Sequence, residues 1–387
     1  MPASTAHARQ ETRDAKTHSP GGAPAPTRLG AMHPAYFALV MATGILAIAC
    51  KLLGLEPLPR LLLAINVPAY AVLWMLTALR AARHPGLFWS DFRNHQRAPG
   101  FFTVVAATAV LGVQFAVQQH APGVALAMWW LAMALWLVLT YAIFTALTVS
   151  ADKPDLAHGI NGGWLTAVVA TQSLVVLGTM VAPHIGRDTE VVGLVLLSLW
   201  LAGGMLYIWM ISLIFYRYTF FRLGPSDLLP PYWINMGAMA ISALAGALLI
   251  RSAPGSALLA SLLPFVKGFT LLYWATATWW IPMLLALGVW RYVVHRVPLT
   301  YDPLYWGAVF PLAMYTSATY RLGEALGVPV LLLVARCFVV AALTAWLMTA
   351  LGLLVSTFMQ ARQRPGARRA APPRPAPAYS TNHRRPP

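Results

Sequence analysis

The chain has 387 residues, of which 59% are hydrophobic and only 10% are charged, and its formal net charge is +16. Soluble domains usually carry about 25% charged residues, and a single water-soluble core cannot bury this much apolar surface. The composition therefore excludes an ordinary soluble protein and indicates an integral membrane protein.

Residues 1–32 are polar and rich in Ala, Pro, His and Arg, and they lack the apolar segment of a signal peptide. We expect a disordered cytoplasmic tail here and a second, Pro- and Arg-rich one at residues 361–387. Basic tails are typical of the cytoplasmic side of membrane proteins, so we expect no nucleic-acid partner. Residues 33–360 between the tails form one predicted membrane domain.

Ten apolar runs in this domain approach the length of about 20 residues that a helix needs to cross a bilayer. Lys and Arg are concentrated in the tails and in the loops after even-numbered runs, which predicts a multi-pass protein of the cell membrane, the inner membrane in a bacterium, with both termini cytoplasmic. The predicted all-α spans are residues 34–53, 61–80, 100–119, 124–149, 163–182, 191–216, 232–250, 264–292, 304–322 and 329–358.

The odd-numbered runs begin alike, and this similarity predicts five repeated helical hairpins. Each starts with a Pro or Gly followed by aromatic residues and continues with small residues, whereas most tryptophans lie in the even-numbered runs. Small residues let helices pack closely, and large aromatic residues suit lipid and the headgroup region. Two arrangements fit the pattern: five odd helices around a pore inside five even ones, or a solid bundle without a pore. The opening segments are HPAYF, APGFF, INGGW, PPYW and DPLYW.

None of the 11 Asp and Glu residues lies within a predicted span. Proton relays usually place such residues at depth, and cation channels often use acidic rings, so the pattern favours anions or neutral solutes. If the odd helices converge, their N-terminal ends add partial positive charge at the cytoplasmic mouth. The spacing of His, Cys, Asp and Glu predicts no metal site, no cofactor and no enzyme.

Polar and aromatic positions of the odd runs are the candidates for lining a pore. Because a helix turns about 100° per residue, these positions cannot all share one face. The candidates are Phe37, Thr43, Gly44, Thr103, Thr108, Thr166, Thr171, Asn235, Ser242, Thr316 and Thr319.

Two further features are distinctive. Pro311 lies inside the ninth run, where it predicts a kink; the adjacent Phe310 could plug a narrow pore, although the pattern alone favours packing between helices. Arg336 is the one charge that lies more than three residues from either end of a predicted span. It could attract an anion, but we favour a structural role in which it pairs with Glu324 across the short loop or extends toward the headgroups.

The segments VMATG in the first run and WGAVFPLAMYTSAT in the ninth, together with ten helices in five hairpins, resemble the tellurite-resistance/dicarboxylate transporter (TDT) family. That family includes the bacterial tellurite-resistance membrane protein, the fungal malate permease and sulfite exporter, and the plant slow anion channels. The resemblance implies a quasi-fivefold ring of hairpins with odd helices inside, a homotrimer with one pore per subunit, and occlusion of the pore by Phe310 beside Pro311.

The function expected from residues and resemblance together is an anion channel or facilitative transporter for small inorganic anions such as chloride, nitrate, sulfite or tellurite. The alternative is a proton-coupled carrier for C4-dicarboxylates such as malate, or for sulfite or tellurite. A dicarboxylate carrier is expected to present basic groups to its substrate, and the odd runs offer none at mid-depth. This observation favours the channel.

Overall fold

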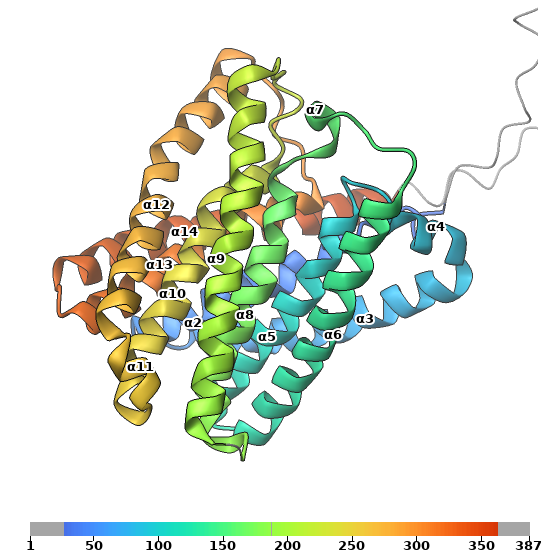
Figure 1. The fold of residues 1–387 in the computed structure, drawn as a ribbon. Helices are drawn as coiled ribbons and strands as arrows, with labels where there is room; N and C mark the ends of the chain where they lie inside the picture. The colour runs from blue at the N-terminus through green and yellow to red at the C-terminus, as the bar shows by residue number, and fades with distance from the viewer. Residues whose placement is uncertain (1–26, 187, 363–387) are drawn as a thin grey trace, which may run out of the picture.

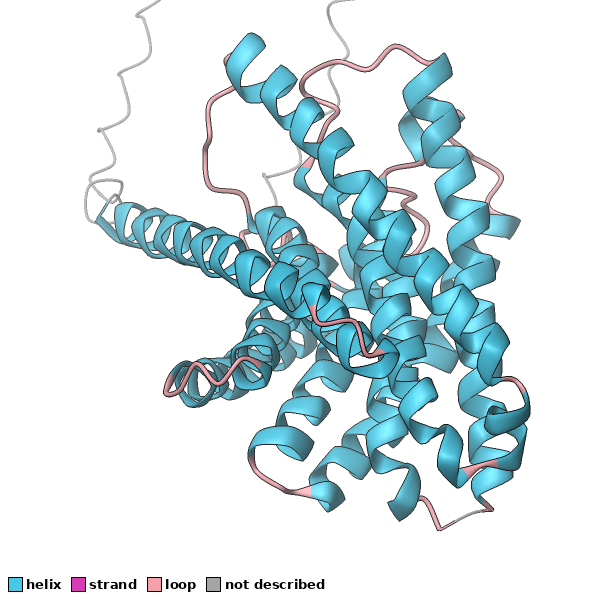
Figure 2. Ribbon diagram, turned by 90° about the vertical axis from the view of Figure 1, so that its left-hand side faces the viewer, coloured by secondary structure: helices cyan, strands magenta, loops and turns pink. Residues whose placement is uncertain are grey.

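The computed structural model describes residues 27–186 and 188–362, and in these residues all regular structure is helical (Figures 1 and 2). The predicted tails therefore lie almost entirely outside the described residues. Ten long helices correspond to the ten predicted spans. They are α2 (Ala38–Leu52), α3 (Leu58–Arg83), α5 (Phe102–Gln118), α6 (Pro122–Val149), α8 (Thr166–Val181), α9 (Thr189–Phe220), α10 (Ile234–Ser252), α12 (Leu263–Val289), α13 (Trp306–Leu326) and α14 (Val330–Arg362).

Nine of the ten, counted with their adjoining turns, are long and apolar enough to cross a membrane in the described part of the chain. The exception is α13, whose Ser, Thr, Tyr and Gly residues and whose Arg321 and Glu324 lower its average apolarity. Three short helices lie in the connections and were not expected from the sequence. They are α4 (Pro85–Asp91), α7 (Leu156–Gly159) and α11 (Ala257–Ser261).

The long helices fall into two sets by burial. In α2, α5, α8 and α10, between 72% and 94% of the most apolar window is buried, and α13 is similarly enclosed; we call these five the buried helices. In α3, α6, α9, α12 and α14 the buried share is between 17% and 50%, and we call these the peripheral helices. Small residues explain the difference, because Ala, Gly, Ser and Thr let helices approach closely on every side.

Contacts between the helices form a closed cycle. The buried helix α2 contacts α5, α5 contacts α8, α8 contacts α10, α10 contacts α13, and α13 returns to α2. Each peripheral helix packs on the buried helix before it in the chain and also touches the buried helix of the next hairpin, as α9 does with α8 and α10 (Figure 1).

Every buried helix begins with one turn of 3₁₀-helix, at the Pro- or Gly-containing segments that the sequence singled out. These turns are η1 (Pro34–Phe37), η2 (Ala98–Phe101), η3 (Gly162–Leu165), η5 (Pro230–Trp233) and η8 (Pro303–Tyr305). Proline is tolerated in a first turn because its missing N–H would have no partner there. Glycine at 162 has a packing role: a Cβ on this residue would lie 2.4 Å from the carbonyl oxygen of Pro231.

An aromatic side chain joins each peripheral helix to the buried helix of the next hairpin, over 2.8 to 3.0 Å. Such hydrogen bonds between membrane helices are worth about 0.6 kcal/mol each on average, so together they favour one order of hairpins. Four of these aromatic residues are tryptophans, which the sequence placed toward lipid. The pairs are Tyr70 with Thr108, Trp136 with Thr171, Trp200 with the Ser242 carbonyl, Trp274 with Thr319, and Trp346 with Thr43.

Candidate functional site

Three cavities follow the buried helices from their first turns to their last. The N-terminal cavity has a volume of about 300 Å³ and is lined by residues from the first turns of all five buried helices, together with polar residues of the preceding loops. The turns contribute two residues each: Ala35 and Ala38, Gly100 and Thr103, Gly163 and Thr166, Pro231 and Ile234, and Leu304 and Gly307.

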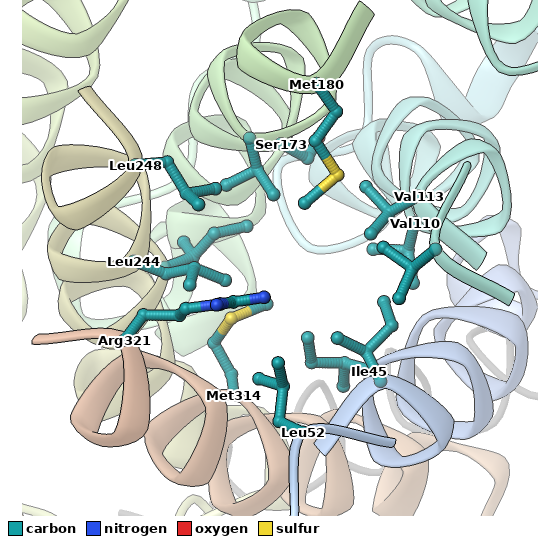
Figure 3. A pocket seen from close by; sticks show the side chains of 14 residues that line it. Ile45, Leu52, Val110, Val113, Ser173, Met180, Leu244, Leu248, Met314 and Arg321 are labelled. Atoms are coloured by element: carbon teal, nitrogen blue, oxygen red, sulfur yellow. The ribbon is translucent and has the colours of Figure 1, made fainter. Parts of the chain in front are cut away.

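The central cavity is far smaller, with a volume of about 20 Å³, which is room for about one water molecule. All five buried helices line it, and every lining residue except Ser173 and Arg321 is apolar (Figure 3). The apolar lining consists of Ile45, Ile48, Leu52, Val110, Val113, Val117, Val176, Met180, Ile241, Leu244, Leu248 and Met314.

The C-terminal cavity, with about 590 Å³, opens beyond the central one. Val117, Met180, Leu248 and Arg321 line both, so the two spaces adjoin. Its other lining residues include His120, His184 and Arg251. Among the described residues that line this cavity there is no carboxylate.

The lining residues repeat at equal spacing in the five buried helices. Counted from Ala38, Thr103, Thr166, Ile234 and Gly307, the residues 7 and 14 positions later line the central cavity in every helix, and those 10 positions later do so in all but α13. Intervals of 7, 10 and 14 keep residues near one face of an α-helix. Each buried helix therefore turns the same face to the shared axis.

Phe310 lies between the N-terminal and central cavities. It follows Gly307, which lines the first cavity, by three residues and precedes Met314, which lines the second, by four, so it shares their face of α13. Its side chain is buried. The equivalent residues of the other buried helices are Met41, Ala106, Val169 and Gly237.

Pro311 packs against this same layer. A Cβ built on Gly237 would lie 2.7 Å from the Cγ atom of Pro311, so α10 and α13 touch here only because residue 237 lacks a side chain. Proline also removes one backbone hydrogen bond of α13, which weakens the helix beside Phe310.

The N-terminal cavity carries positive potential from several sources. First turns of helices carry partial positive charge, and Arg97 lines the cavity. Asp91 holds this arginine through Nε at 2.6 Å, and it also pairs with the buried Arg80 at 2.7 Å. One carboxylate facing two guanidinium groups leaves the cluster with a net positive charge.

His33 also lines this cavity, and its Nδ1 atom accepts a hydrogen bond from the Ala35 N–H at 3.1 Å. Burial, with the positive charge of Arg97, lowers the pKa of His33 from 6.5 to about 4. The side chain is therefore neutral at neutral pH, which leaves Nδ1 free to accept.

Acidification should destabilise the fold through His33. Between pH 6.5 and pH 4 the unfolded chain binds a proton that the folded chain does not, so stability is full above pH 6.5 and falls by about 3 kcal/mol as pH drops to 4. His33→Asn keeps an acceptor without a titrating group, so thermal unfolding in detergent should lose part of its dependence on pH over this range. An unchanged dependence would contradict this role.

The structure separates the sequence-predicted pore residues into two groups. Thr103 and Thr166 line the N-terminal cavity. Their hydroxyls donate to the carbonyls of Gly100 and Gly163 and also lie within hydrogen-bond distance of the Pro34 and Pro99 carbonyls of the preceding repeat. Five others take part in the contacts with aromatic residues of the peripheral helices described above: Thr43, Thr108, Thr171, Ser242 and Thr319.

The remaining candidates also contact helices rather than a cavity. Phe37 packs edge-on against Tyr70 and Trp74 of α3, the Asn235 amide donates to Tyr218 of α9, and Thr316 donates to the carbonyl of Leu312. Gly44 lies against side chains of α3 and α5. Whether any candidate lines a conducting path stays a prediction. The apolar residues of the central cavity were missed, and aligning the five hairpins by their opening turns would have found them.

Arg336 and Glu324 do not pair in the described structure. Glu324 accepts instead from Arg321 at 2.7 Å and from Arg251 at 3.2 Å. Arg321 precedes Glu324 by three residues on α13, so their side chains are neighbours on one helix face. Arg336 lies on α14, about 9 Å along the helix from Val330. Arg336 is exposed on this peripheral helix, and its extension toward the headgroups stays a prediction.

A family model described as voltage-dependent anion channel (SLAC1) matches residues 31–354. The chain belongs to this family. The predicted membership of the TDT family is thereby confirmed, and with it the expectation of a membrane transport protein.

Individual relatives of this chain are named as a membrane protein, a transporter and an efflux pump. An uncharacterized membrane protein of Mycobacterium tuberculosis is 41% identical over 38% of this chain and 75% of its own length. An uncharacterized transporter of Methanocaldococcus jannaschii is 26% identical over 76% of this chain and 85% of its own. A sulfite efflux pump of Arthroderma benhamiae is 23% identical over 77% and 83%.

Proposed function

We propose that this protein is an anion channel or facilitative transporter whose path runs along the axis shared by the five buried helices, in a quasi-fivefold ring of hairpins. The observation that carries the proposal is the equal register at which these helices line a narrow apolar cavity between two wider ones. A solid bundle would not place wider cavities at both ends of that register.

Electrostatics support anions as the permeant species. The N-terminal cavity combines five helix N-termini with Arg97, and the linings of the three cavities contain Arg but neither Asp nor Glu in the described residues. Cation pores usually present acidic rings. An anion would therefore meet favourable potential at the wide mouths and an apolar barrier between them.

The barrier has two parts in this proposal. Phe310 closes the layer between the N-terminal and central cavities, where it is the largest side chain beside Met41, Ala106, Val169 and Gly237. The apolar central cavity adds a dewetted segment, because ions lose hydration in a narrow space without polar partners. Pro311 positions the ring and allows local movement of α13.

Small inorganic anions such as chloride, nitrate, sulfite and tellurite are the proposed substrates, and the family match and the sulfite efflux pumps among the relatives support this class. A proton-coupled carrier for malate or sulfite is the alternative.

We further propose, from the family resemblance, that the protein forms a homotrimer in the cell membrane with a path in each subunit. Both termini are cytoplasmic in this proposal, so the N-terminal cavity faces the cytoplasm.

Flux into liposomes that contain the purified protein distinguishes the two functions. We expect nitrate and chloride to move when a membrane potential is imposed at equal pH on both sides, because the proposed path contains no proton relay. Protein-free liposomes provide the background. Malate or sulfite uptake that requires a pH gradient, with no movement driven by potential alone, would overturn the channel in favour of the coupled carrier.

A further inference from the structure

Arg321 departs from the repeat of the buried helices. It occupies the position 14 residues after Gly307, where the other four helices present Leu52, Val117, Met180 and Leu248. Its guanidinium extends into the space between these apolar side chains (Figure 3). Because Arg321 lines both the central and the C-terminal cavity, it lies where the narrow segment opens.

Glu324 positions Arg321 but does not neutralise all of the positive charge at this place. The Nη1 atom of Arg321 donates to Oε2 of Glu324 at 2.7 Å, and the same oxygen accepts from Nη1 of Arg251 at 3.2 Å. Two guanidinium groups on one carboxylate leave one net positive charge. No hydrogen bond from the other N–H groups of Arg321 is found among the described side chains, and the side chain is 19% exposed.

A cation is needed at this end of the path more than at the other. The five buried helices present their first turns, with partial positive charge, to the N-terminal cavity, whereas α5, α8, α10 and α13 line the C-terminal cavity near their last turns, which carry partial negative charge. An anion that leaves the apolar segment would meet this negative potential. Arg321 and Arg251, paired with Glu324, add a net positive charge that offsets part of this negative potential where the central cavity opens.

We propose that Arg321 binds a small oxoanion at the boundary between the central and C-terminal cavities and makes the path prefer oxoanions to halides; this inference rests on the proposed anion function. The planar guanidinium presents parallel N–H groups that match two oxygens of one oxoanion, whereas a spherical halide cannot use both in the same way. Glu324 positions the guanidinium by accepting the hydrogen bond from Nη1 of Arg321.

Binding is tested first, on the full-length protein in detergent, because it does not require conduction. Thermal unfolding is followed with nitrate or sulfite against chloride at constant ionic strength. We expect the oxoanions to stabilise the parent protein, and Arg321→Met to weaken their apparent affinity roughly tenfold. Arg60→Met is the matched control. Arg60 lies in the first turn of α3, just after the C-terminal end of α2, and its side chain is 82% exposed. It lines none of the three cavities.

Ion selectivity is tested next in liposomes, with Phe310→Ala present in every protein. The ratio of nitrate to chloride permeability should fall roughly tenfold with Arg321→Met, while the ratio of bromide to chloride stays constant. Arg321→Lys keeps the positive charge but lacks the parallel N–H groups of a guanidinium. It should therefore retain anion conduction and lose most of the preference for nitrate.

Equal oxoanion binding in the parent protein and in Arg321→Met, or no oxoanion binding in the parent, would overturn the assignment. An unchanged permeability ratio in Arg321→Met and Arg321→Lys would also overturn it. If oxoanions bind through Arg321 but no variant conducts, the site stands and the proposed transport function fails.

Discussion

Replacing Phe310 by alanine is expected to raise anion flux about 100-fold in liposomes. The ring lies in the layer with Met41, Ala106, Val169 and Gly237, between two cavities lined by the same face of α13. Removing it joins those cavities, and a barrier lower by about 3 kcal/mol corresponds to about a 100-fold faster passage. Nitrate or chloride efflux at a fixed membrane potential measures the change directly.

Phe102→Ala is the matched control for this variant. Phe102 is an equally buried phenylalanine of a buried helix, but its ring packs against Phe144 of α6, on the peripheral side. Its loss should cost comparable packing energy and leave flux near the wild-type level. If Phe102→Ala opened the protein as much as Phe310→Ala, the increase would reflect loosened packing, and a specific plug at Phe310 would be wrong.

The second large effect is expected on stability, from Asp91→Asn. Asp91 is buried and pairs with Arg80, of which only 3% is exposed, and with Arg97. Removing the carboxylate leaves a buried guanidinium without a counter-charge, which typically costs 3–5 kcal/mol, so we expect a loss of about 4 kcal/mol. Thermal unfolding in detergent should show a large decrease in Tm.

Glu56→Gln serves as the comparison, because the pair of Glu56 with Lys51 is exposed on both sides. Solvent already screens this pair, so its removal should leave the unfolding temperature unchanged. A small effect of Asp91→Asn, similar to that of Glu56→Gln, would mean that Arg80 finds other partners. Its bond to the Gly30 carbonyl is the obvious one.

Local sequence signals predicted the helices and their starting turns well. The segments PAYF, APGF and PPYW form the 3₁₀ turns η1, η2 and η5, which open α2, α5 and α10, because proline at a first turn loses no hydrogen bond. Continuous apolar runs of membrane length placed the long helices to within a few residues. The short helices α4, α7 and α11 carry no comparable apolar signal.

The direction that each side chain faces was much harder to predict. Buried helices made of Ala, Gly, Ser, Thr and Val are apolar on every side, so no polar stripe marks the axis. Hydroxyls do not by themselves mark the axis, because Thr108 and Thr171 bond to carbonyls one turn earlier and to aromatic residues of peripheral helices. They need no water-filled lumen to satisfy them.

Arg321 illustrates a second limit of the sequence. Its position near the end of a span is typical of an arginine that extends to the headgroups, and nothing in the sequence marks it as facing a cavity. Only the packing of α13 among the other buried helices shows that this side of the helix faces a cavity. The exposed Arg336, which looked more unusual in the sequence, lies on a peripheral helix.

The path along the five buried helices is tested most directly by cysteine accessibility. In a Phe310→Ala protein with Cys50→Ala and Cys337→Ser, a single cysteine is placed at Val113 in the central cavity or at Val138, which is 65% exposed on α6. We expect an anionic methanethiosulfonate reagent to stop anion flux through Val113→Cys and to leave Val138→Cys unaffected. Flux that persists after complete labelling of Val113→Cys would place the path elsewhere.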